Sequence, residues 1–406
     1  MKLLRGFKGL FNSLLILFIV GGFAITTLAQ IQAVSSLIPV QAEKGWGIMT
    51  REGIWQIPAI YQKVQLVEDS LVLVCQQGKF GVLAIDQSVV VPLEYDKLLL
   101  AGKGVLLAKK EGKYGYLTTN GQELLPFVYE GGYPLESNGW MAVKQQGKWG
   151  FVDQKAAIKV PLEYDYVRSF EGALLPVSKK GKIGLLNSQQ KLIMPIFCDQ
   201  VGQYGEGLIA VGRNGLSGYL NEEGQLKIQM IYHQTRAFKE GMAAVKMQDS
   251  WGYIDPKGAI VLPFEYEEAF SFEQGVARVK KGGKWQLIEP KGKVLSALYD
   301  NMGKLVEQSY WVQQGQKLGY INAQGQWLIP ANYDANHKRN FAEGLVAVQR
   351  DNTWGYLDKE GKVVLDFVYQ EAGDFKQGLA LVKQGAQKGY INREGAWVYR
   401  FNLDEK

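Results

Sequence analysis

The chain has 406 residues, a net charge of +6, 47% hydrophobic residues and 12% aromatic residues. This apolar content excludes an intrinsically disordered chain, because it is enough to offset the entropy lost on folding. Residues 1–29 hold three basic and no acidic groups, so the remainder carries only +3. A charge this small argues against a nucleic-acid partner.

The N-terminal segment has the pattern of an export signal. Lys2, Arg5 and Lys8 precede a largely apolar stretch that covers residues 10–29. Its length lies between that of a signal-peptide core and that of a membrane span, so residues 1–29 are predicted to be a signal peptide or a signal-anchor helix. Either reading places the rest in the cell envelope outside the cytoplasm, periplasmic or membrane-anchored. If the segment is not cleaved, residues 10–29 contact the membrane.

A glycine that usually follows a large residue recurs along the rest of the chain, at spacings of 33 to 36 residues and mostly 34. A fixed period of this kind indicates a repeat architecture. Residues 30–35 are therefore interpreted as a short linker, and residues 36–406 as an array of about eleven repeats. The repeat positions are Trp46-Gly47, Phe80-Gly81, Tyr114-Gly115, Trp149-Gly150, Ile183-Gly184, Ser217-Gly218, Trp251-Gly252, Trp285-Gln286, Leu318-Gly319, Trp354-Gly355 and Lys388-Gly389.

Each repeat has the signature of β-structure. Short β-branched or aromatic runs alternate with glycine-bearing turns, as at residues 242–245, 251–255 and 260–263, which predicts a three-stranded meander. A Pro-x-x-Tyr motif follows, as from Pro263 to Tyr266. Because proline lacks a backbone N–H, we expect it to end the third strand. The segment after the tyrosine is expected to be a loop.

Two segments show the pattern best: Gly-Lys-Trp-Gly-Phe-Val-Asp at residues 147–153 and Thr-Trp-Gly-Tyr-Leu-Asp at residues 353–358. The pattern resembles the WG, or KWG, β-repeat family, and the resemblance extends from about residue 36 to the C-terminus. It implies tandem β-repeats with a general binding or scaffolding role. This sequence departs from the family where Ile183, Ser217, Leu318 and Lys388 replace the aromatic residue and where Gln286 replaces the glycine.

One repeat cannot bury its apolar face alone, so each must pack against the next. An open β-solenoid or superhelix and a closed propeller-like array both satisfy this requirement. Propellers typically have four to eight blades of about 40 residues, so eleven shorter units favour the open form. The predicted fold is therefore an all-β open solenoid, preceded by one N-terminal hydrophobic helix.

Groups suited to catalysis are sparse. The two histidines, His233 and His337, lie in different repeats, and the common metalloprotease, hydrolase and phosphate-loop motifs are missing. We therefore predict no catalytic residue, no cofactor and no metal ligand. His233 occupies a loop position that is an aspartate in other repeats, which indicates a structural role. Cys75 and Cys198 occupy non-equivalent repeat positions and are expected to be buried free thiols.

Lysines precede several of the repeat aromatic residues, and stacking could align them into a basic stripe for an anionic polymer or a lipid headgroup. The favoured alternative is that they are turn residues, neutralised by the acids that follow the repeat tyrosines. The six lysines are Lys79, Lys113, Lys148, Lys182, Lys284 and Lys317.

Most tryptophans fill slots that recur in other repeats; Trp55, Trp327 and Trp397, for example, share a slot that is elsewhere aliphatic. Trp311 differs, because its slot holds alanine in several other repeats. It lies near the stretch of the array that departs most from the repeat pattern, and a functional site can account for such a departure. The predicted binding patch consists of Tyr310, Trp311, His337, Lys338 and Arg339.

These observations favour a non-enzymatic exported protein whose extended β-surface binds a protein or a cell-wall glycan in the envelope. An immunity or inhibitor protein that blocks a toxin is one version of this hypothesis. The alternative from another class is a polysaccharide-active envelope enzyme that uses surface carboxylates.

Overall fold

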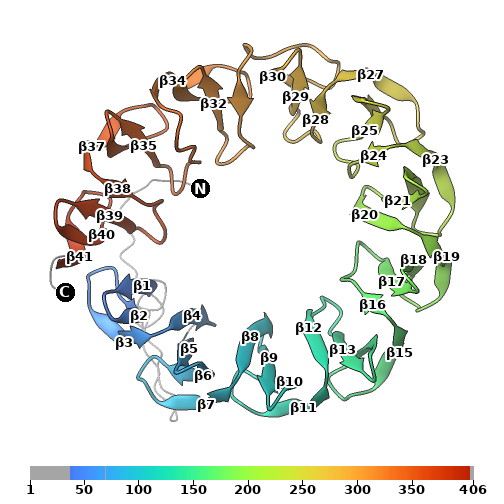
Figure 1. The fold of residues 1–406 in the computed structure, drawn as a ribbon, viewed down its shortest axis with the longest axis horizontal. Coiled ribbons are helices and arrows are strands. Elements are labelled where there is room, and N and C mark those ends of the chain that lie inside the picture. The colour runs from blue at the N-terminus through green and yellow to red at the C-terminus, as the bar shows by residue number, and fades with distance from the viewer. Residues whose placement is uncertain (1–36, 69, 403–406) are drawn as a thin grey trace, which may run out of the picture.

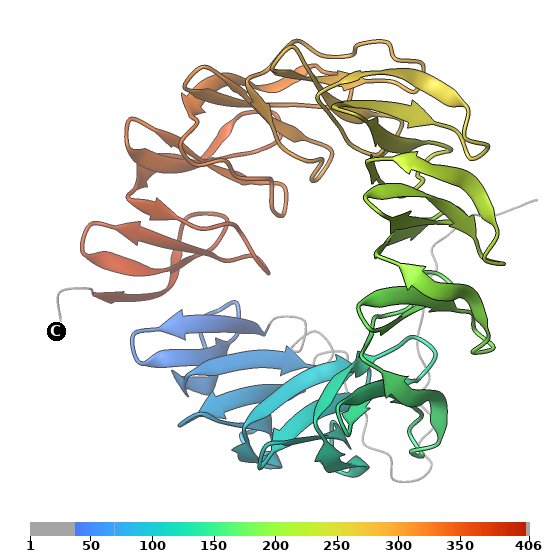
Figure 2. The same ribbon diagram turned by 45° about the vertical axis from the view of Figure 1, so that its right-hand side comes forward.

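The computed structural model describes residues 37–68 and 70–402. The signal or anchor helix predicted for residues 1–29 and the linker predicted for residues 30–35 lie outside the described residues. The described part folds into eleven antiparallel sheets, numbered here as blades 1 to 11 in chain order. Figures 1 and 2 show that the blades form a ring, in which blade 1 lies beside blade 11. In the described part, no helix is long and apolar enough to cross a membrane.

The first strand of a complete blade lies nearest the centre of the ring (Figure 1). It is formed by the segment after the repeat tyrosine, which was predicted to be a loop, so the expected three-stranded meander is wrong for most blades. The strand is only two residues long in five blades, which explains why the sequence pattern does not reveal it. These inner strands are β4 (Lys63–Val67), β8 (Lys97–Gly102), β12 (Gly131–Leu135), β16 (Tyr166–Val167), β20 (Gln200–Gly205), β24 (Gln234–Thr235), β28 (Glu268–Ala269), β31 (Asn301–Met302) and β38 (Glu371–Ala372).

A tight hairpin of the second and third strands forms the middle of each blade. The second strands are β1 (Ile38–Ala42), β5 (Leu71–Gln76), β9 (Val105–Lys110), β13 (Met141–Gln145), β17 (Leu175–Lys179), β21 (Leu208–Arg213), β25 (Ala243–Met247), β29 (Ala277–Lys281), β32 (Tyr310–Gln314), β35 (Val346–Arg350) and β39 (Ala380–Gln384). The third strands are β2 (Gly45–Met49), β6 (Lys79–Ala84), β10 (Lys113–Thr118), β14 (Lys148–Val152), β18 (Lys182–Leu186), β22 (Leu216–Asn221), β26 (Ser250–Ile254), β30 (Lys284–Ile288), β33 (Lys317–Ile321), β36 (Thr353–Leu357) and β40 (Gln387–Ile391).

The fourth strand lies on the outside of the ring (Figure 1). Where the Pro-x-x-Tyr motif is present, this strand continues through the motif to the tyrosine. The outer strands are β3 (Trp55–Tyr61), β7 (Val89–Tyr95), β11 (Glu123–Tyr129), β15 (Ile158–Tyr164), β19 (Leu192–Cys198), β23 (Leu226–Tyr232), β27 (Ile260–Tyr266), β34 (Trp327–Asp334), β37 (Val363–Tyr369) and β41 (Trp397–Asn402).

The repeat glycine lies where the outer strand crosses the third strand. In blade 4, a Cβ added to Gly150 would stand 2.5 Å from the carbonyl oxygen of Val160. The pairing slips here, because Trp149 pairs with Tyr164 whereas Phe151 pairs with Val160. The outer strand therefore bulges, and Pro161 lies in the bulge, where no ladder bond needs its N–H. The expectation that proline ends this strand is wrong for that reason.

Blade 8 shows what happens without the glycine. Gln286 takes its place, and the sheet of blade 8 contains only β28, β29 and β30. The segment that follows contacts β30 through isolated bridges, one between Ile288 and Val294 and one between Trp285 and Tyr299. The side chain of Gln286 is buried at this position.

The apolar core is divided among the interfaces between blades. Eleven buried clusters are present, and each joins two consecutive blades. One of them joins Val40 and Met49 of blade 1 to Leu379 of blade 11. An open array of eleven units would have ten interfaces, so the ring is closed. The protein is an eleven-bladed β-propeller, and the predicted open solenoid is wrong.

The interfaces between blades taper towards the centre of the ring. Small side chains such as Ala269 and Ala372 lie at the inner strands, whereas Phe127 and Phe264 pack at the outer strands. Each blade is therefore narrower at its inner strand than at its outer strand, as a closed ring requires. The sequence-based expectation rested on the usual blade number.

Candidate functional site

A buried tyrosine, next to the repeat glycine on the third strand, ties blade to blade. Tyr219 Oη donates to the carbonyl of Arg236 at 2.7 Å, and Tyr253 Oη donates to the carbonyl of Phe270 at 2.7 Å. Burial raises the pKa of both phenols, so they remain neutral donors. These bonds fix the backbone of Arg236 and Phe270, which lie on the inner side of the ring. The same bond joins Tyr116 to Tyr133, Tyr320 to Arg339 and Tyr356 to Gly373.

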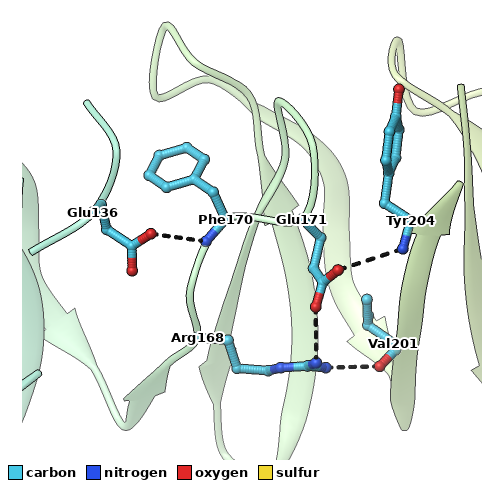
Figure 3. A network of polar contacts seen from close by, with 6 residues as sticks. All are labelled: Glu136, Arg168, Phe170, Glu171, Val201 and Tyr204. Atoms are coloured by element: carbon cyan, nitrogen blue, oxygen red, sulfur yellow. Dashed lines mark hydrogen bonds and ion pairs between the residues drawn. The ribbon is translucent and has the colours of Figure 1, made fainter. Parts of the chain in front are cut away.

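Arginine and glutamate side chains form a second set of links across the interfaces. In blade 5, Arg168 Nη1 donates to the carbonyl of Val201 at 2.7 Å, and its Nη2 lies 3.3 Å from the carboxylate of Glu171 (Figure 3). Glu171 in turn accepts the N–H of Tyr204 of blade 6 at 3.4 Å. The charge of Arg168 is therefore compensated by an adjacent carboxylate.

Blade 7 has the same arginine in a different electrostatic setting. Arg236 Nε donates to the carbonyl of Ala269 at 2.7 Å, which repeats the bond that Arg168 makes. However, the position three residues later, which is Glu171 in blade 5, is Lys239 in blade 7. The nearest carboxylate to Arg236, that of Glu268, is 3.8 Å away. The positive charge of Arg236 is therefore less well compensated than that of Arg168.

These residues line a cleft of about 490 Å³ that extends over blades 6 to 9. The cleft is lined by four basic side chains and by only one carboxylate, that of Glu273. The Glu273 carboxylate lies 3.8 Å from the ammonium group of Lys239. An excess of positive charge in a concave site favours an anionic ligand. The basic residues are Arg236, Lys239, Arg278 and Lys304, and Phe270, Val276, Leu305 and Tyr310 supply the apolar wall.

Two of the basic groups are held by aromatic rings. The guanidinium carbons of Arg236 and Arg278 lie 4.3 and 4.2 Å from the centre of the Phe270 ring. Arg236 also lies 4.8 Å from Trp251, and Arg278 lies 5.7 Å from Trp285, so rings and cations alternate. Such stacking covers the faces of a guanidinium and leaves its N–H edge for hydrogen bonds.

The stacked arginines are already ordered and partly desolvated before any ligand binds. Arg278 Nη1 donates to the carbonyl of Met302 at 2.8 Å, which fixes its position. Burial lowers the pKa of both arginines, although a guanidinium keeps its charge at neutral pH. Each guanidinium carries five N–H donors, of which these carbonyls use one. The cleft therefore presents preorganised donors to an oxyanion.

The structure divides the predicted binding patch between different interfaces. Tyr310 is buried and lines the cleft, where burial raises its pKa to about 12. Trp311 is the next residue on β32 and therefore points to the opposite face, over Gly303 and towards blade 10. Lys338 Nζ lies 5.6 Å from the Trp311 ring. Tyr310 and Trp311 therefore cannot contact one ligand from the same side.

The other two patch residues surround Trp354. The ring of His337 lies 5.2 Å from that of Trp354, and the guanidinium of Arg339 lies 4.8 Å from it. Arg339 Nη1 also pairs with Asp374 of blade 11 at 3.0 Å. A ligand-binding role for these five residues stays a prediction.

The sequence reasoning missed Arg236, Lys239, Phe270 and Arg278. One signal was available: Arg278 occupies the same slot as Trp311, which is alanine in several other repeats. A second signal was that blade 7 has Lys239 at the position that is Glu171 in blade 5. Neither reveals the stack of rings and cations, because that stack forms across the interface of two blades.

Several structural predictions are confirmed. His233 Nδ1 accepts the N–H of Gln248 at 2.9 Å, as the carboxylate of Asp199 accepts the N–H of Asn214 at 2.7 Å. Five of the six lysines pair with the aspartate at the position that follows the repeat-tyrosine slot, which supports their interpretation as turn residues rather than as a basic stripe. These pairs are Lys79 with Asp96, Lys148 with Asp165, Lys182 with Asp199, Lys284 with Asp300 and Lys317 with Asp334.

Both cysteines, Cys75 and Cys198, are buried and free, as predicted. Within residues 37–68 and 70–402, no group of three or more His, Cys, Asp or Glu side chains is placed to hold a metal ion.

The repeat corresponds to a known family. The family model described as "WG containing repeat" matches residues 114–149, 149–182, 218–250, 251–285, 319–354 and 354–386. The chain belongs to the WG-containing repeat family. In this WG-repeat protein, Gln286 of blade 8, which stands in place of the glycine, lies just beyond the matched residues 251–285. No protein of curated function matches the sequence.

Several solved structures are similar to this WG-repeat protein at low identity. A eukaryotic initiation factor matches at 9% identity and a TM-score of 0.43, over 72% of this chain and 94% of that chain. The extracellular domain of a putative one component system from B. thetaiotaomicron matches at 9% identity and a TM-score of 0.25, over 91% and 70%. Hsv2p of Kluyveromyces lactis matches at 11% identity and a TM-score of 0.30, over 55% and 91%.

Proposed function

We propose that this WG-repeat protein is a non-enzymatic binding module of the cell envelope, and that its cleft on blades 6 to 9 holds an acidic segment of a partner protein. The observation that carries the proposal is the pair of arginines that both pack against the Phe270 ring. The envelope location rests on the export-signal pattern of residues 1–29. Inhibition of a secreted toxin is one form that such binding takes.

The geometry favours a carboxylate ligand. The N–H edge of a guanidinium matches the two oxygens of a carboxylate, and such charge-assisted bonds are stronger than neutral ones. Arg236 and Arg278 are held by rings and by backbone carbonyls, so little side-chain entropy is lost on binding. The cleft extends over four blades, which suits an extended segment with several acidic side chains.

The same geometry argues against a sugar in this cleft. Sugar rings bind aromatic side chains through an uncovered ring face. The guanidinium carbons of Arg236 and Arg278 lie 4.3 and 4.2 Å from the centre of the Phe270 ring, so the ring already packs against two cations. A protein segment is therefore the better match than a glycan for this site.

The test is binding of a glutamate-rich peptide to the purified protein, measured by fluorescence anisotropy beside a glutamine-rich peptide of the same length. Arg236→Gln and Arg278→Gln should each weaken binding by about tenfold or more, the value expected for loss of a charge-assisted bond. Arg168→Gln is the matched control, because Arg168 makes the same carbonyl bond but lies outside the cleft. Equal binding of both peptides, or full affinity in the cleft variants, would contradict the proposal.

A further inference from the structure

A second hollow, of about 630 Å³, lies over blades 8 to 10 and shares no lining residue with the basic cleft. It lies beside blade 8, whose sheet has no fourth strand in the described part. Turns from three blades surround it, and Trp327 at the start of β34 forms part of its wall. The polar wall consists of Gln274, Glu307, Gln308, Asn322, Gln324, Lys359 and Glu360.

The side chain of Trp327 is held in place by its neighbours and is partly exposed to solvent. Blade 9 has Ala331 where blade 7 has Phe264 and blade 10 has Phe367, and the indole takes up the space over Gly319 that these rings fill elsewhere. Its ring also meets that of Tyr299 edge to face, with centroids 5.7 Å apart. Even so, 41% of Trp327 stays exposed. A rigid, partly exposed indole offers an apolar surface on which a flat ligand can stack.

The charges in the hollow are largely paired within the protein. Glu307 accepts the N–H of Gly344 at 2.9 Å and lies 3.3 Å from Lys359 Nζ. The remaining wall is rich in primary amides, from Gln274, Gln308 and Gln324, each of which offers both donors and an acceptor. This chemistry suits a neutral polar ligand, in contrast to the basic cleft.

Gln308 breaks a local rule at this point. The two-residue turn just before the second strand ends with glycine in other blades, as at Gly241, Gly275 and Gly344. In blade 9 this position is Gln308, whose φ is +65°, in the left-handed region that disfavours side chains. Strained positions of this kind gather at functional sites, where the side chain is needed. Here the strained residue supplies an amide to the hollow.

We propose that the hollow binds a neutral glycan with acetamido groups, one sugar ring stacking on Trp327 and the glutamine amides bonding the acetamido and hydroxyl groups. A pyranose has one face of C–H groups, which matches the exposed indole. An acetamido group offers an N–H and a C=O, which pair with the C=O and NH2 of a glutamine side chain. The site is separate from the basic cleft, so the protein holds an acidic segment and a glycan at different places.

The test uses the full chain and the tetramer of N-acetylglucosamine, with binding measured by calorimetry. Trp327→Leu places in blade 9 the residue that blade 6 has at the same slot, Leu226, so the blade should still fold. We expect this variant to bind the tetramer at least tenfold more weakly. The matched control is Ile158→Ala, at the same slot of blade 4, which should bind normally.

Gln308→Gly separates a binding role from a structural one. It relieves the left-handed strain, so it should raise the melting temperature while it weakens binding of the tetramer. Unchanged affinity in Trp327→Leu and Gln308→Gly, or no binding of the tetramer to the native protein, would overturn the proposal. Glutamate-peptide binding should be unaffected in both variants, so the outcome for the glycan site is independent of the outcome for the basic cleft.

Discussion

The backbone N–H of Gln41 donates to Tyr390 Oη at 3.1 Å, and this bond joins the first blade to the last across 349 residues of sequence. Tyr390 holds the position at which other blades carry the tyrosine that bonds the next blade. Beside it, Trp55 of blade 1 and Tyr399 of blade 11 meet edge to face at 5.2 Å. The closing interface therefore uses the same tyrosine position as the other interfaces, although here the hydroxyl accepts the bond, and in residues 37–68 and 70–402 no strand is shared between the first blade and the last.

The closing interface should be the weakest of the eleven. Its cluster has four buried residues, whereas the cluster between blades 7 and 8 has eleven. Met49→Ala, which removes a fully buried side chain, should cost about 2–5 kcal/mol. Hydrogen exchange should then rise first in blades 1 and 11. Ile254→Ala, at the same slot in blade 7, should instead raise exchange in blades 6 and 7; the same pattern in both variants would count against a closing interface.

The repeat glycine should resist substitution wherever an outer strand crosses it. Gly150→Ala forces a Cβ to within 2.5 Å of the carbonyl oxygen of Val160, so the free energy of unfolding should fall by about 1–3 kcal/mol. Urea denaturation measures this change. Gln286→Ala in blade 8 is the control and should have a much smaller effect, because no strand crosses that position. Equal losses in the two variants would show that the crossing does not select glycine.

Acid should destabilise the ring through four aspartates that pair with lysines. A hydrogen bond from the paired lysine lowers the pKa of each of these carboxyl groups below the ordinary value of 3.8. Their contribution to stability is therefore present above pH 3.8 and is lost as the pH falls through the folded-state pKa. The residues are Asp96, Asp165, Asp199 and Asp300.

Melting temperatures between neutral pH and about pH 3 test this prediction. Replacement of the four aspartates by asparagine should reduce the dependence on pH in this range. High salt should also reduce it, because the pairs are exposed and screened. If the melting temperature depends on pH to the same extent in the four-asparagine variant and in the native protein, other groups are responsible for the sensitivity to acid.

The two thiols should report on unfolding. Burial raises the pKa of the Cys198 thiol to about 11, so little thiolate exists at neutral pH. Neither Cys75 nor Cys198 should react with a maleimide reagent in the native protein, and both should react in denaturant. Mass spectrometry counts the labels. Rapid labelling of Cys198 under native conditions would mean that blades 5 and 6 separate readily.

Much of the blade could be predicted from the sequence. The hairpin from β25 to β26 follows from its short apolar runs and turn residues, and Asp255 Oδ1 accepts the N–H groups of Lys257 and Ala259 at 2.9 Å, as expected for a turn cap. The inner strand was missed because it is as short as two residues, Glu268–Ala269 in blade 8. The bulge at Pro161 was missed because it depends on the contact of its strand with Gly150.

Closure and the basic cleft could not be predicted, since both depend on how blades meet. The angle between blades depends on many packing contacts, and a small change in each decides whether eleven blades form a ring. The stack of Arg236, Phe270 and Arg278 combines residues from two blades, and the sequence alone does not show that they face each other.

The distance between the ends of the array tests the central structural claim most directly. Arg51 and Gln377 are exposed on blades 1 and 11, and the side chain of Arg51 lies within 3.7 Å of the position that a Cβ on Gly378 would take. Spin labels on Arg51→Cys and Gln377→Cys can be attached selectively, because both native thiols are buried. The closed propeller predicts one short, narrowly distributed distance in double electron–electron resonance. A long or broad distribution would mean that the ring is open and would contradict the account.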